Sequence, residues 1–158
     1  MLKTKMIYRF LSFCCLCLLV ATSYAAPTNK NEAVQINLQL FKVVLKDGKE
    51  ALVDAKETKP GETVEYRATY KNVSKSAVRN LKATLPVPDG MEYVAKTVNP
   101  AIAEASTDKK NFALMPLMRA NGKEAIPTKE YRAVRWLVPE LAADKSFVVS
   151  ARMKVAQQ

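Results

Sequence analysis

The chain has no histidine, only four glycines and a single tryptophan among its 158 residues. Its three cysteines, Cys14, Cys15 and Cys17, all lie close to the N-terminus. If that segment is removed, the remaining chain has neither a disulfide nor a thiol nucleophile. Without His or Cys it also lacks the side chains that bind zinc most readily. We therefore expect no metal and no cofactor, and a fold whose stability comes from an ordinary apolar core.

The same shortage weighs against enzymatic activity. Nucleophilic catalysis needs a nucleophile beside a base, and the only local Ser-Lys cluster, Ser74-Lys75-Ser76, falls in an expected solvent-exposed loop. Glu62, Glu65 and Asp89 are expected in turns or on outward strand faces, where carboxylates keep a surface soluble. Each glycine stands in a turn signal and none in a phosphate-binding loop. The sequence predicts no catalytic residues and a protein that is not an enzyme.

The first 25 residues have the three parts of a secretory signal. Three basic side chains and no acidic one precede an apolar stretch over residues 10–21, and small residues follow at Ser23 and Ala25. We predict cleavage after Ala25, with Ala26 as the second choice. An uncleaved anchor would need about 20 apolar residues, and a lipid-modified cysteine would stand at the end of the apolar stretch rather than in its middle. The sequence predicts export, to the periplasm or to the cell surface.

The surplus of positive charge is moderate and dispersed. The signal holds three of the 25 Lys and Arg residues and none of the 15 Asp and Glu residues, so the remaining 133 residues carry a net charge of +7. The nearest approach to a cluster is Lys109-Lys110. Nucleic-acid binders concentrate charge on one face or arm, so we expect no nucleic-acid partner. Attraction to an acidic envelope polymer or a lipid surface stays open.

Alternation of apolar and polar residues predicts strands through most of the remaining chain. Residues 26–33 are polar and predict a flexible lead-in, and residues 34–158 form one domain. The clearest period-two runs are residues 64–71 and 147–155, and a third begins at Val34. Further strands are expected at residues 51–53, 78–85, 91–98, 112–118 and 131–138. About seven to nine strands separated by Pro and Gly turns predict an all-β, antiparallel β-sandwich with Tyr66, Tyr70 and Trp136 in its core.

A series of landmarks carries a family resemblance from about Lys59 to the C-terminus. In order they are a turn at Pro60-Gly61, a strand ending at Asn72, a turn at Leu85-Pro86, the strand of Trp136 and a final strand after Leu141. This order resembles a bacterial surface-protein repeat domain, domain of unknown function 11. The resemblance implies an immunoglobulin-like sandwich used in envelope architecture or adhesion, without established catalytic residues.

The chain departs from that pattern in three places. Asp144-Lys145 stands where the family has glycine, and Thr84 stands where it has aspartate before Leu-Pro. The segment Asn99–Glu130 has no clear counterpart. The family also occurs in tandem arrays, whereas this chain holds one copy.

Two groups of residues are candidates for docking a partner. One is apolar and could instead fill the core as an edge strand: Leu114, Met115, Leu117 and Met118. The other is basic, lies on outward strand faces and could instead be a solvated surface: Arg67, Lys71, Arg152 and Lys154. We predict a non-enzymatic module of the bacterial envelope that binds another envelope protein. A chaperone that pairs strands with an exported subunit and a glycan-binding module are the alternatives.

Overall fold

The computed structural model describes residues 32–157. The predicted signal, both cleavage positions (Ala25 and Ala26) and most of the predicted lead-in lie outside these residues. The described chain contains nine strands and one short 3-10 helix, η1. The strands are β1 (Val34–Lys46), β2 (Lys49–Asp54), β3 (Thr63–Asn72), β4 (Val78–Pro86), β5 (Met91–Tyr93), β6 (Glu104–Ser106), β7 (Ala113–Leu114), β8 (Ala133–Leu141) and β9 (Ser146–Val155), and η1 is Thr128–Glu130.

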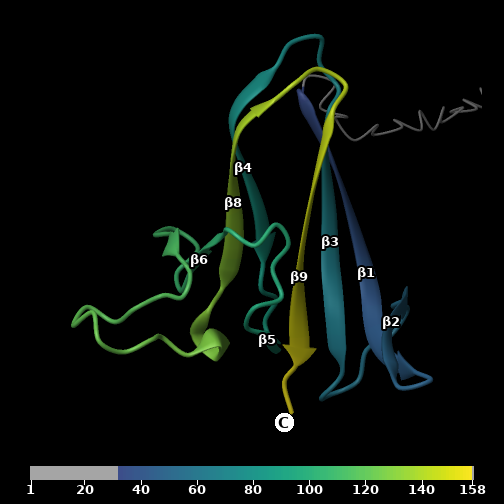
Figure 1. Ribbon diagram of the computed structural model, residues 1–158, viewed down its shortest axis with the longest axis vertical. Coiled ribbons are helices and arrows are strands. Elements are labelled where there is room, and N and C mark those ends of the chain that lie inside the picture. Colours follow the sequence, from purple (N-terminus) through teal and green to yellow (C-terminus); the bar gives the residue numbers. More distant parts are fainter. Residues whose placement is uncertain (1–31, 158) are drawn as a thin grey trace, which may run out of the picture. The chain divides into compact units, whose positions relative to one another are not determined.

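These strands form two antiparallel sheets that face each other. Sheet A has the order β2-β1-β3-β9-β5, and sheet B has the order β4-β8-β6-β7. Figure 1 shows β1, β3 and β9 in one layer and β4 and β8 in the other. The predicted antiparallel β-sandwich is confirmed, and its architecture is consistent with an immunoglobulin-like fold.

The core lies where the inward faces of the two sheets meet. The alternation predicted for residues 64–71 is confirmed, since Val64, Tyr66, Ala68 and Tyr70 are all buried. Trp136 of β8 is 2% exposed and donates its indole N–H to the carbonyl of Pro100 at 2.7 Å. Two further aromatics of the core are not among the predicted core residues. Their rings, from Tyr93 and Tyr131, are stacked with centroids 5.6 Å apart.

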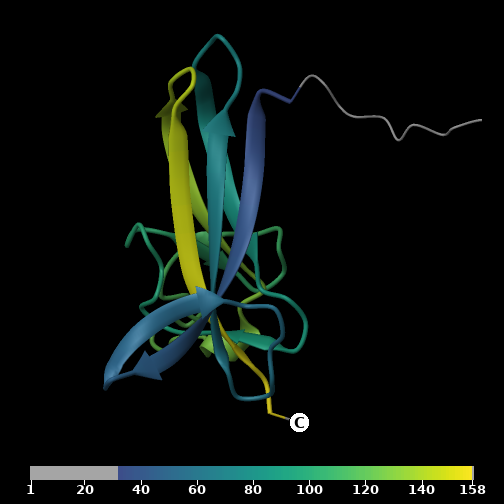
Figure 2. The same cartoon turned by 90° about the vertical axis from the view of Figure 1, so that its right-hand side faces the viewer.

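The β1–β2 hairpin follows from its turn residues. Asp47 and Gly48 both have positive φ, 53° and 74°, as the mirror-image turn of a two-residue hairpin requires. The end of this hairpin lies over the outer face of sheet A (Figure 2), where Glu50 reaches Arg152 of β9. The hairpin thereby covers part of a sheet face that would otherwise face solvent.

Two predicted strands are much shorter than expected. The strand predicted at 91–98 ends at Tyr93, because the backbone turns away at Lys96, where φ is 60°. The strand predicted at 112–118 is reduced to the two residues of β7, and Pro116 has no N–H with which to continue a ladder. The segment 99–130 is irregular, as the sequence indicates.

Candidate functional site

Residues 32–157 contain no cluster of three or more His, Cys, Asp or Glu side chains that could hold a metal ion. The Ser-Lys cluster is used structurally: the Ser74 hydroxyl, a single donor, lies 2.7 Å from Asn72 Oδ1 and 2.8 Å from the Ser76 carbonyl oxygen. Two other surfaces stand out, and both involve sheet A. One is a strand edge on β1, and the other is a polar cleft on the outer face.

The first surface is the N-terminal half of β1. The partner strand β2 pairs only with residues 41–46 of β1, and the carbonyl of Leu40 accepts the N–H of Ala55. Residues 34–39 therefore pair with β3 on one side, and no strand among residues 32–157 pairs with them on the other. We call residues 34–39 the open edge.

The hydrogen-bonding phase of β1 tells which groups face away from β3. The N–H of Val73 donates to the carbonyl of Ala33, so the odd-numbered residues of β1 bond to β3. Because bonded and non-bonded pairs alternate in an antiparallel ladder, the even-numbered residues direct their backbone N–H and C=O groups outward. The open edge thus presents the N–H and C=O of Val34, Ile36 and Leu38 for pairing.

The apolar side chains of the same residues are also uncovered. Ile36 and Leu38 stand opposite Tyr70 and Ala68 of β3, both of which face the core. They nevertheless remain 58% and 49% exposed. Inward-facing side chains are normally buried against the second sheet. Here the second layer does not reach far enough to cover β1.

The facing edge of sheet B is protected, in contrast to the open edge. The Tyr70 hydroxyl donates to the carbonyl of Thr84 and accepts its N–H, both at 2.9 Å, so the edge groups of β4 are satisfied there. Asn80 has a φ of 53° and forms no ladder pair with Pro139 of β8, although the register is the same on either side of it, and Lys82 adds an exposed charge. Charged side chains, lysine above all, are a usual defence of a strand edge. Residues 34–39 contain no charge, no proline and no bulge.

The second surface is a polar cleft of about 430 Å³ on the outer face of sheet A. Its floor is formed by β3 and β9, and the loop that follows β5 forms one wall. We call it the outer cleft, and its lining residues are Glu65, Arg67, Lys96, Thr97, Val98, Asn99, Ser150 and Arg152. A hollow of this size lies within the range that binds small molecules.

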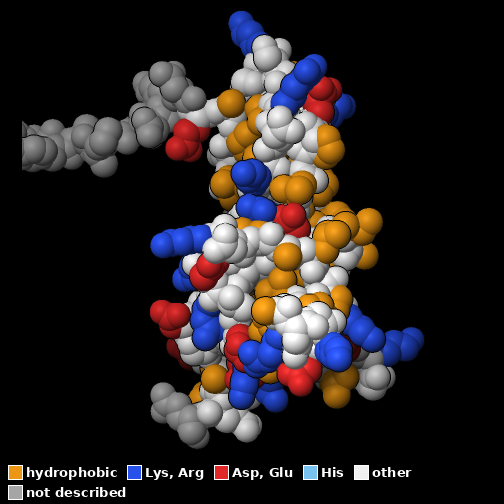
Figure 3. Space-filling model, turned by 90° about the vertical axis from the view of Figure 1, so that its left-hand side faces the viewer, with side chains coloured by type: hydrophobic (Ala, Val, Ile, Leu, Met, Phe, Trp, Pro, Cys, Tyr) orange, Lys and Arg blue, Asp and Glu red, His pale blue; other side chains and the backbone are white. Residues whose placement is uncertain are grey.

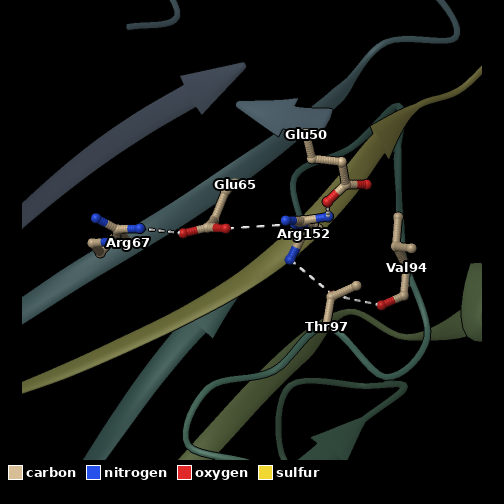
Figure 4. Close-up of polar contacts among 6 residues, drawn as sticks. All are labelled: Glu50, Glu65, Arg67, Val94, Thr97 and Arg152. Atoms are coloured by element: carbon tan, nitrogen blue, oxygen red, sulfur yellow. Dashed lines mark hydrogen bonds and ion pairs between the residues drawn. The ribbon is translucent and has the colours of Figure 1, made fainter. Parts of the chain in front are cut away.

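A charge network crosses the floor of the outer cleft (Figure 4). Glu65 accepts a hydrogen bond from Arg67 at 2.6 Å and contacts Arg152 Nε at 3.5 Å. Arg152 also donates to Glu50 at 2.7 Å. The hydrogen bond with Glu50, opposed by partial burial, raises the pKa of Arg152. The prediction that Glu65 lies on a solvated face is wrong: Glu65 is 8% exposed because the hairpin end and the two arginines cover it.

The loop after β5 is tied to β9 by specific hydrogen bonds. The Thr97 hydroxyl donates to the Val94 carbonyl at 2.6 Å and accepts the Arg152 N–H at 3.0 Å. Asn99 and Ser150 exchange two backbone hydrogen bonds of 2.8 and 2.7 Å. These bonds fix one wall of the cleft on the strand that supplies its floor.

The predicted apolar docking group is divided by the structure. Leu117 is 7% exposed and Met115 packs against the core, whereas Leu114 and Met118 are 65% and 46% exposed. The Leu117 N–H donates to the buried Tyr131 hydroxyl at 2.8 Å. The four residues therefore do not form one exposed surface.

The predicted basic group is also divided. Arg67 and Arg152 belong to the charge network, with side chains 37% and 26% exposed. Lys71 and Lys154 are exposed. On the face seen in Figure 3, basic and acidic side chains are interspersed rather than gathered by sign. Only the two arginines are brought together at a hollow.

Within residues 32–157 no helix is long and apolar enough to cross a membrane. No family model and no curated protein matches the chain, so the resemblance to domain of unknown function 11 stays a prediction. Among solved structures the chain is similar to a Corynebacterium diphtheriae protein named "Putative membrane anchored protein", with 16% identity and a TM-score of 0.49. The match covers 80% of this chain and 28% of that chain. Because the identity and the TM-score are this low, the fold is assigned from the strand order and the buried residues of the chain itself.

Proposed function

We propose that this protein is an exported, non-enzymatic interaction module of the bacterial envelope that binds another envelope protein by strand pairing. The open edge is the observation that carries the proposal. It combines outward N–H and C=O groups of Val34, Ile36 and Leu38 with uncovered inward-facing side chains. An added strand would satisfy the backbone groups and cover Ile36 and Leu38 in one step.

The partner that fits this edge is an extended segment with apolar side chains at alternate positions. In a strand, alternate side chains share a face, so one set would extend the core over β1 while the other set stays in water. The same geometry favours the strand-pairing chaperone as a second candidate. A chaperone would release its client, whereas a structural module would keep its partner.

The N-terminal signal pattern supports an envelope location, and the ordered landmarks from Lys59 onward support a surface-protein relationship. Both rest on the sequence alone.

The test uses a charge placed on the open edge. Ile36→Lys puts a cation where an apolar strand would lie, and we expect binding of the partner recovered from envelope extracts to weaken about tenfold or more. Leu137→Lys is the matched control, because Leu137 is 57% exposed, like Ile36 at 58%, but lies on β8 of sheet B.

A second measurement reports the pairing itself. The amide protons of Ile36 and Leu38 should exchange rapidly in the free protein and slowly in the complex, because the added strand would accept their hydrogen bonds. Equal loss of binding in both lysine variants, or unchanged exchange at these amides in the complex, would refute strand pairing at this edge.

A further inference from the structure

The outer cleft has a second property that strand pairing does not use. It is lined by three cationic side chains, Arg67, Lys96 and Arg152, against one carboxylate, Glu65. Glu50 lies at its border and pairs with Arg152. Even when both carboxylates are counted, the cleft keeps an excess of one positive charge.

Arg67 is held in a fixed orientation with donors to spare. Its guanidinium lies 4.9 Å from the centroid of the Phe41 ring and donates to Glu65 at 2.6 Å. A guanidinium has five N–H donors, and among the described residues Arg67 uses one of them in a hydrogen bond. A pre-oriented guanidinium binds an oxyanion with little loss of conformational freedom.

Lys96 is placed at the cleft by an unusual backbone conformation. Its φ is 60°, a region that residues with a Cβ adopt at a cost. Within residues 32–157 its ammonium group forms no ion pair. A strained position next to a hollow is a pattern found at ligand sites.

The rest of the lining is neutral, and apart from Val98 it is polar. Among the described residues, the side chains of Asn99 and Ser150 form no hydrogen bond. The Asn99 amide and the Ser150 hydroxyl are therefore available to a ligand. Such groups exchange hydrogen bonds with hydroxyls as both donors and acceptors. A ligand that matches this lining carries one negative charge and several hydroxyl groups.

We propose that the outer cleft binds an acidic sugar residue, with its carboxylate at Arg67 and Lys96 and its hydroxyls toward Asn99 and Ser150. The hollow of about 430 Å³ suits one sugar ring better than an extended peptide. This site goes beyond the proposed function, because the cleft opens on the outer face of sheet A whereas the open edge exposes its inner face.

The test is a titration of the purified protein with glucuronate, followed by amide NMR shifts, with glucose at the same ionic strength as the neutral counterpart. We expect glucuronate to shift the amides of Asn99 and Ser150 and glucose to shift them much less. Acetylglutamate amide is a third probe. If it binds more tightly than glucuronate, the ligand is an acidic peptide and the sugar proposal is wrong.

Two variants isolate the contribution of Lys96. Lys96→Gly removes the ammonium group and relieves the positive φ, so the fold should be retained while glucuronate affinity falls about fivefold. Lys109→Gly is the matched control, because Lys109 is also an exposed lysine with a positive φ, 62°, but lies outside the cleft. Equal weakening by both variants would mean non-specific attraction to a basic protein and would overturn the proposal.

The experiments can refute either proposal without refuting the other. Ile36→Lys should leave glucuronate binding unchanged while it weakens partner binding, and Lys96→Gly should leave the amide exchange of the open edge unchanged. Absence of any shift with glucuronate would reject the sugar site and would leave the strand-pairing proposal intact.

Discussion

Asn72 holds together the end of β3, the following loop and the end of β8, and its replacement should be among the most damaging single changes. Its amide donates to the carbonyls of Ser76 at 2.8 Å and Leu141 at 2.9 Å. Its Oδ1 accepts the N–H and the hydroxyl of Ser74 at 3.0 and 2.7 Å. The side chain is fully buried, so water cannot replace the bond to Leu141.

The expected magnitude for Asn72→Ala follows from these four bonds. A hydrogen bond contributes about 1 kcal/mol net, and a buried acceptor left without a donor costs about 1–3 kcal/mol. The Ser74 and Ser76 groups lie near solvent and can recover part of their loss, whereas the Leu141 carbonyl cannot. We expect a loss of about 3 kcal/mol from a domain whose total stability is of order 5–15 kcal/mol.

Denaturant unfolding followed by fluorescence measures this loss, because the single tryptophan, Trp136, is 2% exposed in the folded protein. Ser74→Ala is the control: it removes the hydroxyl bonds of the loop but keeps the bond to Leu141, and should cost about 1 kcal/mol. If Asn72→Ala were no worse than Ser74→Ala, the buried bond to Leu141 would not be the reason for the effect.

Two further predictions concern single polar groups. Backbone N–H groups of the loop after Asp108 donate hydrogen bonds to its carboxylate and hold its pKa well below the ordinary value of 3.8. The stabilisation from Asp108 is therefore complete above about pH 4 and is lost as the pH falls through the lowered pKa. The difference in unfolding free energy between the wild type and Asp108→Asn should shrink in acid, and a difference that stayed constant would contradict this. Tyr70→Phe removes both hydrogen bonds to Thr84, so it should lower the unfolding free energy by about 1–2 kcal/mol and speed the exchange of the Thr84 amide. Tyr66→Phe loses one weak hydrogen bond to a sulfur and should cost less. Equal costs would mean that Tyr70 does not protect the edge of β4.

The sandwich itself could be predicted because its signals are local. Alternation on β3 and β9 identifies the buried face residue by residue, and the turn at Asp47-Gly48 fixes where β1 reverses. These features depend on neighbours within a few residues along the chain. These features can therefore be predicted without knowing which strands pair.

Glu65 shows where that reasoning fails. Its position on β3 alternates with Val64 and Tyr66, so a period-two pattern assigns it to the outer face, and that assignment is correct. The error lies in equating the outer face with solvent. Glu50 and Arg152, from strands distant in sequence, bring the hairpin end over Glu65, and such a fold-back leaves no periodic signal. The same holds for the loop at Lys96, whose positive φ ended the predicted strand early.

The open edge is the complementary case. Alternation correctly places Ile36 and Leu38 on the inward face, and from this one expects them to be buried. Burial, however, also requires a second layer of sufficient width, and sheet B ends at β4, whose edge Tyr70 and Asn80 close off. An inward face without a covering strand and an outward face covered by a hairpin thus occur on the same sheet. A ligand in the outer cleft would lie on the outer face of sheet A, whereas a strand on the open edge would extend the sheet beside β1. The strand β3 contributes both Arg67 to the cleft and the pairing partner of Ile36, so it is the element through which one could affect the other.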